Sequence, residues 1–303
     1  RQMCIRDRVH PFDGCYKSLY LWFVMRLRLA LYYDYRVHAG TPEEAAKRNQ
    51  ALIQHTALAE SCGFDMVWLA EHPTNPEAAM PSALILCAAI AAQTDTMRFG
   101  TGVLPLPLYH PLRVAEDAAS IDGLGNGRFE LGVGLGGEVE GFQDYGVEVN
   151  ERSARFEESI ILLRQAWSKD EISFQGAHFE IEGIQVVPKP TQPLGPPIWI
   201  GAGVPEAQRR AARLGTGLFV PQGASPIEYL RSWDTFNDNA GLARVALLCP
   251  EEDFSEAVEK VKAFSNLPLS LDLVVPALGP RGLRSTKELQ EIEKKFRDGL
   301  LSI

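Results

Sequence analysis

Two side chains that can transfer protons stand directly after an apolar segment near residue 70. The segment MVWL is followed by Ala70-Glu71-His72-Pro73, and a histidine in such a place can accept or donate a proton near neutral pH. We therefore take Glu71 and His72 as candidate catalytic residues. The alternative is that His72 only caps the loop in which it lies.

A glycine-rich turn later in the chain has the features of a phosphate site. The segment PPIWI ends in Gly201-Ala202-Gly203, and a predicted helix begins at Pro205. Free N–H groups and the positive end of the helix dipole attract anions at such a turn, and glycine lets the backbone come close to a bound group. The alternative is that a tight turn needs small residues whether or not anything binds. A second run, GVGLGG over residues 132–137, lacks a helix directly after it and is a weaker candidate.

Polar residues that follow other apolar segments are candidates for contact with a substrate. They are Tyr33, Tyr109 and His110, with Asp34, Pro105 and Gln222 as further members of a mixed polar and apolar cavity. His110 precedes a proline, so the alternative for this residue is that it starts a helix.

Eight segments from Met25 onward have the length and composition of strands. They cover residues 26–32, 66–69, 98–104, 128–134, 197–200, 217–220, 244–248 and 269–275. Predicted helices separate them, including residues 80–93 and 112–124, and Thr41-Pro42-Glu43-Glu44 combines a cap, a first-turn proline and two acids at a helix start. Strands and helices that alternate in this way predict an α/β fold, a (β/α)8 TIM barrel with its ligand site at the carboxyl ends of the strands.

Residues 171–187 interrupt the alternation. Their sequence, EISFQGAHFEIEGIQVV, alternates polar and apolar residues around two glycines, which predicts a β-hairpin insertion before strand 5 of the barrel. The loop over residues 137–150, after the fourth strand, is long and acidic. We expect both segments to be lids or substrate walls, because long loops at the catalytic face of a barrel commonly cover or line the site.

Composition narrows the class of protein. The 303 residues are 46% hydrophobic and 23% charged, which suits one globular domain, assigned to residues 25–303. Residues 1–24 show no clear period and are assigned as a non-domain N-terminal extension, with a short docking arm as the alternative. A net charge of −9 without a basic run argues against nucleic acid as a partner. The longest apolar run, residues 83–92, is too short for a membrane span. Scattered cysteines indicate neither a metal site nor disulfides and favour a cytoplasmic location.

Three stretches, in this order and spacing, resemble the bacterial luciferase-like monooxygenases, a family of flavin- or deazaflavin-dependent (β/α)8 enzymes. The stretches are GFDMVWLAEH, RFGTGVLPLPLYHPLRVAEDAASIDGLGNGRFELGVGLG and FQGAHFEIEGIQVVPKPTQPLGPPIWIGAG, followed by RRAARLG. The resemblance runs from about Met25 to Leu218 and weakens beyond that point.

The resemblance implies roles for individual residues. His72 matches a histidine beside the flavin ring that assists the oxygen chemistry of the cofactor, and Gly102-Val103 matches a cis peptide under the ring. The turn after the fourth strand matches a second wall of the site, and the turn after the fifth strand matches the segment that receives the flavin phosphate. The cofactor-binding residues implied are Thr101, Gly102, Val103, Leu135, Gly136, Gly201, Ala202 and Gly203.

Two positions depart from the pattern of the family. Leu135 stands where many relatives carry arginine, and Gly203 stands where many carry serine. Both missing groups would contact phosphate, and Arg128 or Arg209 are candidate replacements. Loss of one charge-assisted contact weakens binding by roughly tenfold to a hundredfold, which suits an enzyme that borrows its flavin.

The resemblance implies a monooxygenase that uses reduced FMN and molecular oxygen to oxidise a small organic substrate. A separate flavin reductase would supply the reduced FMN, and the subunit would form a homodimer or a heterodimer. One alternative is a deazaflavin-dependent dehydrogenase or reductase on the same barrel. Another is a non-catalytic flavin-binding partner subunit, an alternative that Leu135 and Gly203 keep open.

Overall fold

The computed structural model describes residues 25–301 apart from positions 39, 79, 81, 138–139, 238–241, 250–251, 263–268 and 280–281. The extension predicted over residues 1–24 lies outside the described residues. Among the described helices, none is both long and apolar enough to cross a membrane.

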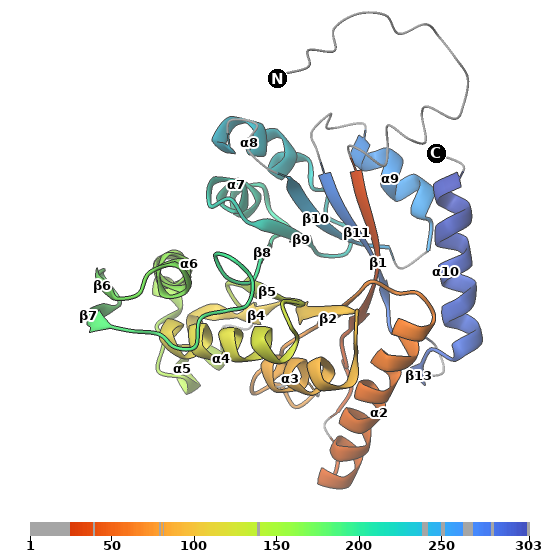
Figure 1. Ribbon diagram of the computed structural model, residues 1–303, viewed down its shortest axis with the longest axis horizontal. Coiled ribbons are helices and arrows are strands. Elements are labelled where there is room, and N and C mark those ends of the chain that lie inside the picture. The colour runs from red at the N-terminus through yellow and green to blue at the C-terminus, as the bar shows by residue number, and fades with distance from the viewer. Residues whose placement is uncertain are drawn as a thin grey trace, which may run out of the picture.

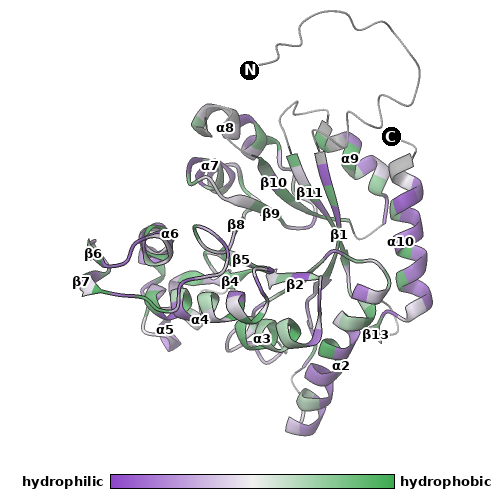
Figure 2. Cartoon of the chain, viewed as in Figure 1, coloured by the Kyte–Doolittle hydropathy of each residue, from purple (hydrophilic) through white to green (hydrophobic). Residues whose placement is uncertain are grey.

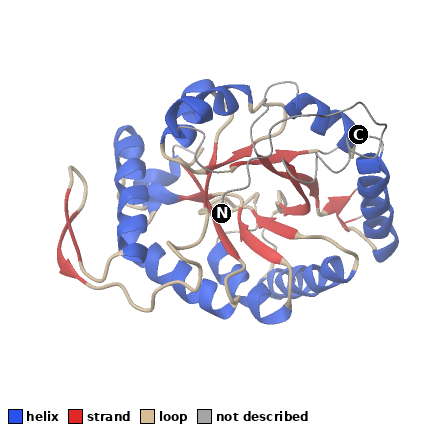
Figure 3. Cartoon of the chain, turned by 45° about the horizontal axis from the view of Figure 1, so that its top comes forward, coloured by secondary structure: helices blue, strands red, loops and turns tan. Residues whose placement is uncertain are grey.

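Eight parallel strands close into a barrel with helices around it (Figure 3). The strands are β1 (Met25–Tyr33), β2 (Met66–Leu69), β3 (Arg98–Thr101), β5 (Phe129–Gly134), β8 (Ile198–Gly201), β9 (Gly217–Val220), β10 (Ala243–Leu248) and β11 (Leu269–Pro276). Neighbours in the ring follow the order β3, β2, β1, β11, β10, β9, β8, β5, and pairing of β3 with β5 closes it. The short β4 (Leu104–Pro105) continues the β3 segment and also pairs with β5. The predicted barrel is confirmed.

Helices follow the strands and cover the outside of the barrel (Figure 1). They are α2 (Pro42–Ser61), α3 (Ala83–Gln93), α4 (Pro111–Leu124), α6 (Arg152–Ser168), α7 (Pro205–Arg213), α8 (Ile227–Asn237), α9 (Phe254–Lys262) and α10 (Thr286–Leu301). The predicted start of α2 is confirmed, because Thr41 and Glu44 form a reciprocal capping box there. Figure 2 shows hydrophilic stretches on α2 and α10, in contrast to the largely hydrophobic α3.

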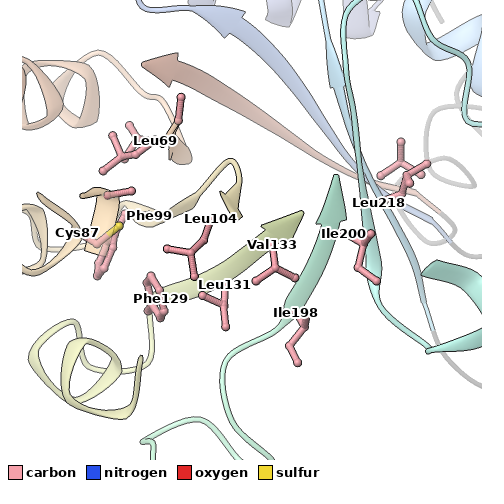
Figure 4. Packing of buried hydrophobic residues seen from close by; sticks show 14 of the residues in the cluster. Leu69, Cys87, Phe99, Leu104, Phe129, Leu131, Val133, Ile198, Ile200 and Leu218 are labelled. Carbon is pink, nitrogen blue, oxygen red and sulfur yellow. The ribbon is translucent and has the colours of Figure 1, made fainter. Parts of the chain in front are cut away.

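Strand alternation separates two apolar cores. Side chains that point outward from the strands pack against the helices, and Figure 4 shows part of this layer, with Phe129, Leu131 and Val133 on β5. Side chains that point inward form a smaller core around Trp68, Trp199 and Phe219. The Trp68 ring meets the other two edge-on, at 5.2 and 5.5 Å between centroids. These rings fill the middle of the barrel.

A buried ionic cluster lies below these rings. Arg28 on β1 contacts Asp272 through Nε and Glu130 through Nη1, each at 2.6 Å. The indole N–H groups of Trp199 and Trp68 donate to Glu130 and Asp272 at 2.7 and 3.2 Å. Burial alone would raise the pKa of Glu130, but Arg28 and Arg98 outweigh burial and lower the pKa to about 2. The cluster therefore holds an ionised carboxylate inside the barrel.

The predicted hairpin exists but does not act as a lid. Strands β6 (Ile172–Gln175) and β7 (Glu180–Ile184) pair antiparallel and lie outside the ring of helices (Figure 3). The turn between them is fixed to α6, where Glu158 accepts a hydrogen bond from the Ala177 amide at 2.8 Å. Phe179 also packs under the Arg155 guanidinium, 4.9 Å from its ring centroid. None of the hairpin residues lines the cavity described below, so the lid prediction for this segment is wrong.

Candidate active site

A cavity of about 860 Å³ opens at the carboxyl ends of the barrel strands, within the range of small-molecule sites. Its base is formed by the last inward-facing residue of each strand or strand end. Going round the barrel from β1, these residues are Tyr32, Ala70, Gly102, Gly134, Gly201, Phe219, Leu248 and Pro276. The four consecutive positions on β2, β3, β5 and β8 are alanine or glycine, so this half of the base lacks large side chains of its own.

Val103 fills the half of the base that the glycines leave open. A Cβ atom added to Gly134 or Gly201 would lie 2.7 or 2.9 Å from the Val103 side chain, so both positions need glycine for Val103 to fit. The peptide bond between Gly102 and Val103 is cis, as the family resemblance implies. Together with Tyr32, Phe219 and Leu248, Val103 gives the cavity a largely apolar floor.

His72 lies on the wall of the cavity in contact with Asp34. Its Nε2 atom lies 2.8 Å from Asp34 Oδ1, and the imidazole is only 14% exposed. Burial alone would raise the pKa of Asp34, but hydrogen bonds from His72 and Arg36 outweigh burial and lower the pKa. Because an ionised carboxylate only accepts hydrogen bonds, Nε2 carries the proton. The Nδ1 atom has no partner among the described residues and is the nitrogen available to a ligand.

Glu71, the neighbour of His72 in the sequence, links the segment after β2 to Tyr109 and to the start of α3. Its Oε1 atom accepts a hydrogen bond from the Tyr109 hydroxyl at 2.5 Å, and its Oε2 atom accepts one from the Ala83 amide at 2.8 Å. The second bond satisfies a backbone N–H group in the first turn of α3, where the Ser82 side chain makes no capping hydrogen bond. Burial raises the pKa of Glu71 to about 7, although Tyr109 and Ala83 oppose the shift. The carboxyl group therefore changes its protonation near neutral pH.

We expect Glu71→Gln to remove a pH dependence of stability. The pKa of Glu71 is above its ordinary value of 4.5, so the folded state binds this proton more tightly. Its effect on the free energy of unfolding is most favourable below about pH 4.5 and is lost as the pH rises through about 7. From about pH 5.5 to about pH 8 the loss is about 2 kcal/mol. Urea unfolding at both pH values measures it.

Glu116→Gln is the control for this experiment, because Glu116 is 41% exposed on α4. The control should follow the pH dependence of the unchanged protein. If Glu71→Gln follows it as well, Glu71 does not titrate in this range.

The turn after β8 provides part of the predicted phosphate site. Gly201, Ala202 and Gly203 line the cavity, but the Ala202 amide donates to the Phe219 carbonyl at 3.0 Å and is not free for an anion. The amides of Gly203 and Val204 have no partner among the described residues. Helix α7 then begins with Pro205, which has no N–H, and with Glu206 in its first turn. The turn offers backbone donors without a cationic side chain.

Neither arginine proposed as a replacement reaches this turn. Arg128 donates to the backbone carbonyls of Gly125, Met97 and Ala91 before the start of β5, which is the opposite end of the barrel. Arg209 pairs with Glu206 and Glu228 at 2.7 and 2.8 Å. The prediction for Arg128 is therefore wrong, and both terminal amino groups of Arg209 are already bound to acids.

Several predicted site residues lie outside the cavity. Tyr33 points outward, is fully buried, and its hydroxyl lies 2.6 Å from His55 Nδ1 on α2. His110 caps α4 by accepting a hydrogen bond from the Leu112 amide, so the helix-start alternative describes it. Tyr109 does not line the cavity, but its hydroxyl donates to Glu71, which does. Thr101 is buried and donates to the Gly132 carbonyl at 2.6 Å.

The cavity is also lined by residues that the sequence analysis did not single out. Tyr32, Arg36, Phe219, Leu248 and Pro276 all face it. The alternation of side chains along a strand could have identified four of them, namely Tyr32, Phe219, Leu248 and Pro276. These side chains point into the barrel, as those of Ala30, Ala246 and Val274 do. The predicted residues that the structure brings together in the cavity lining are Asp34, Glu71, His72, Gly102, Val103, Pro105, Leu135, Gly136, Gln222 and the turn at 201–203.

The loop over residues 137–150 contributes to the cavity wall as predicted. Gly137, Gly141 and Phe142 line it, the last two from the short helix α5 (Glu140–Asp144). A Cβ atom on Gly141 would lie 3.2 Å from the Thr74 hydroxyl, so the loop meets the segment after β2. These two segments narrow the mouth of the cavity.

The lining fits a flat tricyclic ring with polar edges. The floor is apolar, the wall after β1 and β2 carries Asp34 and His72, and the opposite wall offers backbone amides at 203–204. Such a ring would rest on Val103, with His72 at its edge. Among the described residues the β8 turn has no cationic side chain of its own, so its backbone amides are the donors that it offers to a phosphate.

Comparison with known proteins gives one family match over most of the chain. The family profile described as luciferase-like monooxygenase matches residues 25–264. An F420-dependent glucose-6-phosphate dehydrogenase of Amycolatopsis mediterranei is 35% identical over 179 residues, which are 57% of this chain and 53% of that protein. The chain spans about half the length of the curated relatives it matches.

Solved structures share the fold. The monooxygenase RslO1 from Streptomyces bottropensis has a TM-score of 0.68 at 21% identity, with 92% of this chain and 99% of that chain covered. The oxygenating constituent of 3,6-diketocamphane monooxygenase of Pseudomonas putida, in complex with FMN, has a TM-score of 0.63 at 18% identity, with 74% and 67% covered.

Proposed function

The chain belongs to the luciferase-like monooxygenase family, and we propose that it is an oxidoreductase that uses reduced FMN and molecular oxygen to oxidise a small organic substrate. The observation that carries the proposal is the pairing of His72 with ionised Asp34 on the wall of a cavity with an apolar floor. Proteins similar to this chain include both a monooxygenase and F420-dependent dehydrogenases.

The residues of the chain have separate tasks in this proposal. Val103, Tyr32 and Phe219 would support one face of the ring, and the amides of Gly203 and Val204 would bind the phosphate. Bound reduced FMN supplies the electrons that activate oxygen. Asp34 holds the proton on His72 Nε2, which leaves Nδ1 to exchange a proton with the reacting group. Phe142 and Gly141 narrow the mouth and help to exclude water.

The proposal includes partners outside the chain. A separate flavin reductase supplies reduced FMN, and the subunit associates with a second copy or with a related subunit. Both partners, and the cytoplasmic location, stay predictions.

A second candidate is a deazaflavin-dependent dehydrogenase. The relative at 35% identity is named as an F420-dependent enzyme, and a histidine held by a carboxylate also suits removal of a proton from an alcohol during hydride transfer. The same cavity serves either reaction.

Cofactor and oxygen use distinguish the two candidates. We expect the protein to bind FMN and to consume oxygen when a flavin reductase and a set of small organic compounds are supplied. Product analysis should show one oxygen atom from labelled oxygen gas. Binding of F420 alone, with loss of its visible absorbance on addition of an alcohol and without oxygen uptake, would support the dehydrogenase and reject the monooxygenase.

We expect Gly203→Asp to weaken FMN binding by about tenfold, because a carboxylate there repels the phosphate. A Cβ atom at this position would lie 3.0 Å from Pro221 Cγ, so the side chain fits after a small shift. Fluorescence titration with FMN and with riboflavin measures the effect, and riboflavin should be unaffected. Gly203→Asn is the matched uncharged control. Equal weakening of both flavins would mean that the substitution distorts the cavity and that the phosphate lies elsewhere.

A further inference from the structure

The cavity has one permanently cationic side chain among the described residues that line it. Five of these residues are ionisable, namely Tyr32, Asp34, Arg36, Glu71 and His72. A guanidinium keeps its charge at all ordinary pH values, so Arg36 is the cation that any ligand meets. It lies in the loop that follows β1.

Arg36 retains hydrogen-bonding capacity toward the cavity. Its Nε donates to Asp34 Oδ2 at 3.0 Å, the one side-chain bond that it makes with the described residues, and the side chain is 61% exposed. The two terminal amino groups are left over, and these form the paired donors that bind carboxylates and phosphates. Asp34 also accepts a hydrogen bond from His72, so one carboxylate is shared between two donors.

The position of Arg36 separates it from the turn proposed for the cofactor phosphate. The ring order places four steps between β1 and β8 in either direction, so the two strands are diametrically opposite. A phosphate at the β8 turn is therefore across the barrel from the loop after β1. An anion held by Arg36 must be a different group from that phosphate.

We propose that Arg36 binds an anionic group of the substrate, so that the substrate class is small organic carboxylates or related oxyanions. This inference rests on the proposed function, because it assumes that the cofactor phosphate occupies the opposite wall. Asp34 connects Arg36 to His72, and a substrate held by Arg36 has the carbon atoms next to its anionic group beside His72. Arg36 thus selects the substrate and orients it.

Binding of simple carboxylates tests the proposal. The probes are butanoate, hexanoate and octanoate, each compared with the uncharged amide of the same length, by calorimetric titration of the protein with and without FMN. At least one acid should bind about tenfold more tightly than its amide. Arg36→Gln should abolish this preference, and Arg36→Lys should retain part of it. Arg113→Gln is the control, because Arg113 is 60% exposed on α4 and away from the cavity.

Two results would overturn the proposal. In the first, acids and amides bind equally to the unchanged protein, or Arg36→Gln keeps the preference. In the second, Arg36→Gln weakens FMN but not riboflavin, which would assign Arg36 to the cofactor phosphate. Failure of the unchanged protein to bind FMN would contradict the proposed function, and the titrations without FMN would still decide the role of Arg36.

Discussion

His72→Ala is expected to lower turnover by ~10²-fold or more while leaving the free energy of unfolding nearly unchanged. The imidazole lies on the cavity wall and is held by Asp34, so its removal takes away a proton donor and acceptor beside the ligand. Its side chain makes one hydrogen bond with the described residues, to Asp34, which limits the loss of stability. The rate of substrate-dependent oxygen consumption at saturating reduced FMN measures turnover, and urea unfolding measures stability.

His110→Ala is the matched control. His110 is also a histidine after a strand end, but it caps α4 outside the cavity, so turnover should be preserved. Unchanged turnover in His72→Ala would instead assign His72 a purely structural role in the loop after β2. The proposed proton transfer would then be abandoned.

The second large effect is expected from Arg28→Met, which should reduce the free energy of unfolding by about 3 to 5 kcal/mol. Arg28 contacts two fully enclosed carboxylates, and methionine would leave Asp272 and Glu130 without this cation inside the barrel. Arg98 still contacts Glu130, so Asp272 loses its only arginine among the described residues. Denaturation by urea at neutral pH measures the change.

Arg213→Met provides the comparison on the surface. Arg213 is 48% exposed and contacts Glu157 at 2.9 Å, and exposed ion pairs contribute at most about 1 kcal/mol. A similarly small loss in Arg28→Met would show that water or protonation of Asp272 compensates the buried charges. Burial already raises the pKa of Asp272 to about 6, which is the direction such compensation would take.

The barrel was predictable because its signals are local. Each strand is a short, mainly apolar segment bounded by glycine, proline or polar residues, and capping residues mark helix starts such as Thr41. The hairpin was predictable for the same reason, since period-two alternation sets its pairing. Its place against α6 depends on contacts such as Phe179 with Arg155, which come from tertiary packing. Local pattern therefore gave the hairpin but not its position.

The site residues were predictable where a reactive or ligand-binding residue directly follows a strand. His72 and the turn at 201–203 lie in the cavity because parallel strands bring their carboxyl ends together. The prediction that Tyr33 contacts the substrate was wrong because adjacent residues of a strand face opposite sides. Tyr32 therefore faces the cavity, and Tyr33 faces α2. Arg36 was missed because its role depends on which residues surround the mouth, and no local pattern encodes that.

Strand β1 carries one residue at every level of the barrel axis. Arg28 belongs to the ionic cluster, Ala30 to the inner core around Trp68 and Trp199, and Tyr32 to the cavity floor, with Asp34 and Arg36 just beyond the strand. Eight residue pairs hold this strand in register with β11. Sliding β1 by two residues toward its carboxyl end would keep its inward face but move the charge of Arg28 into the layer of Trp68 and Trp199, and would shift Asp34 and Arg36 away from the cavity at the same time. Selection for a stable interior and selection for ligand recognition thus act on the same short stretch of polypeptide.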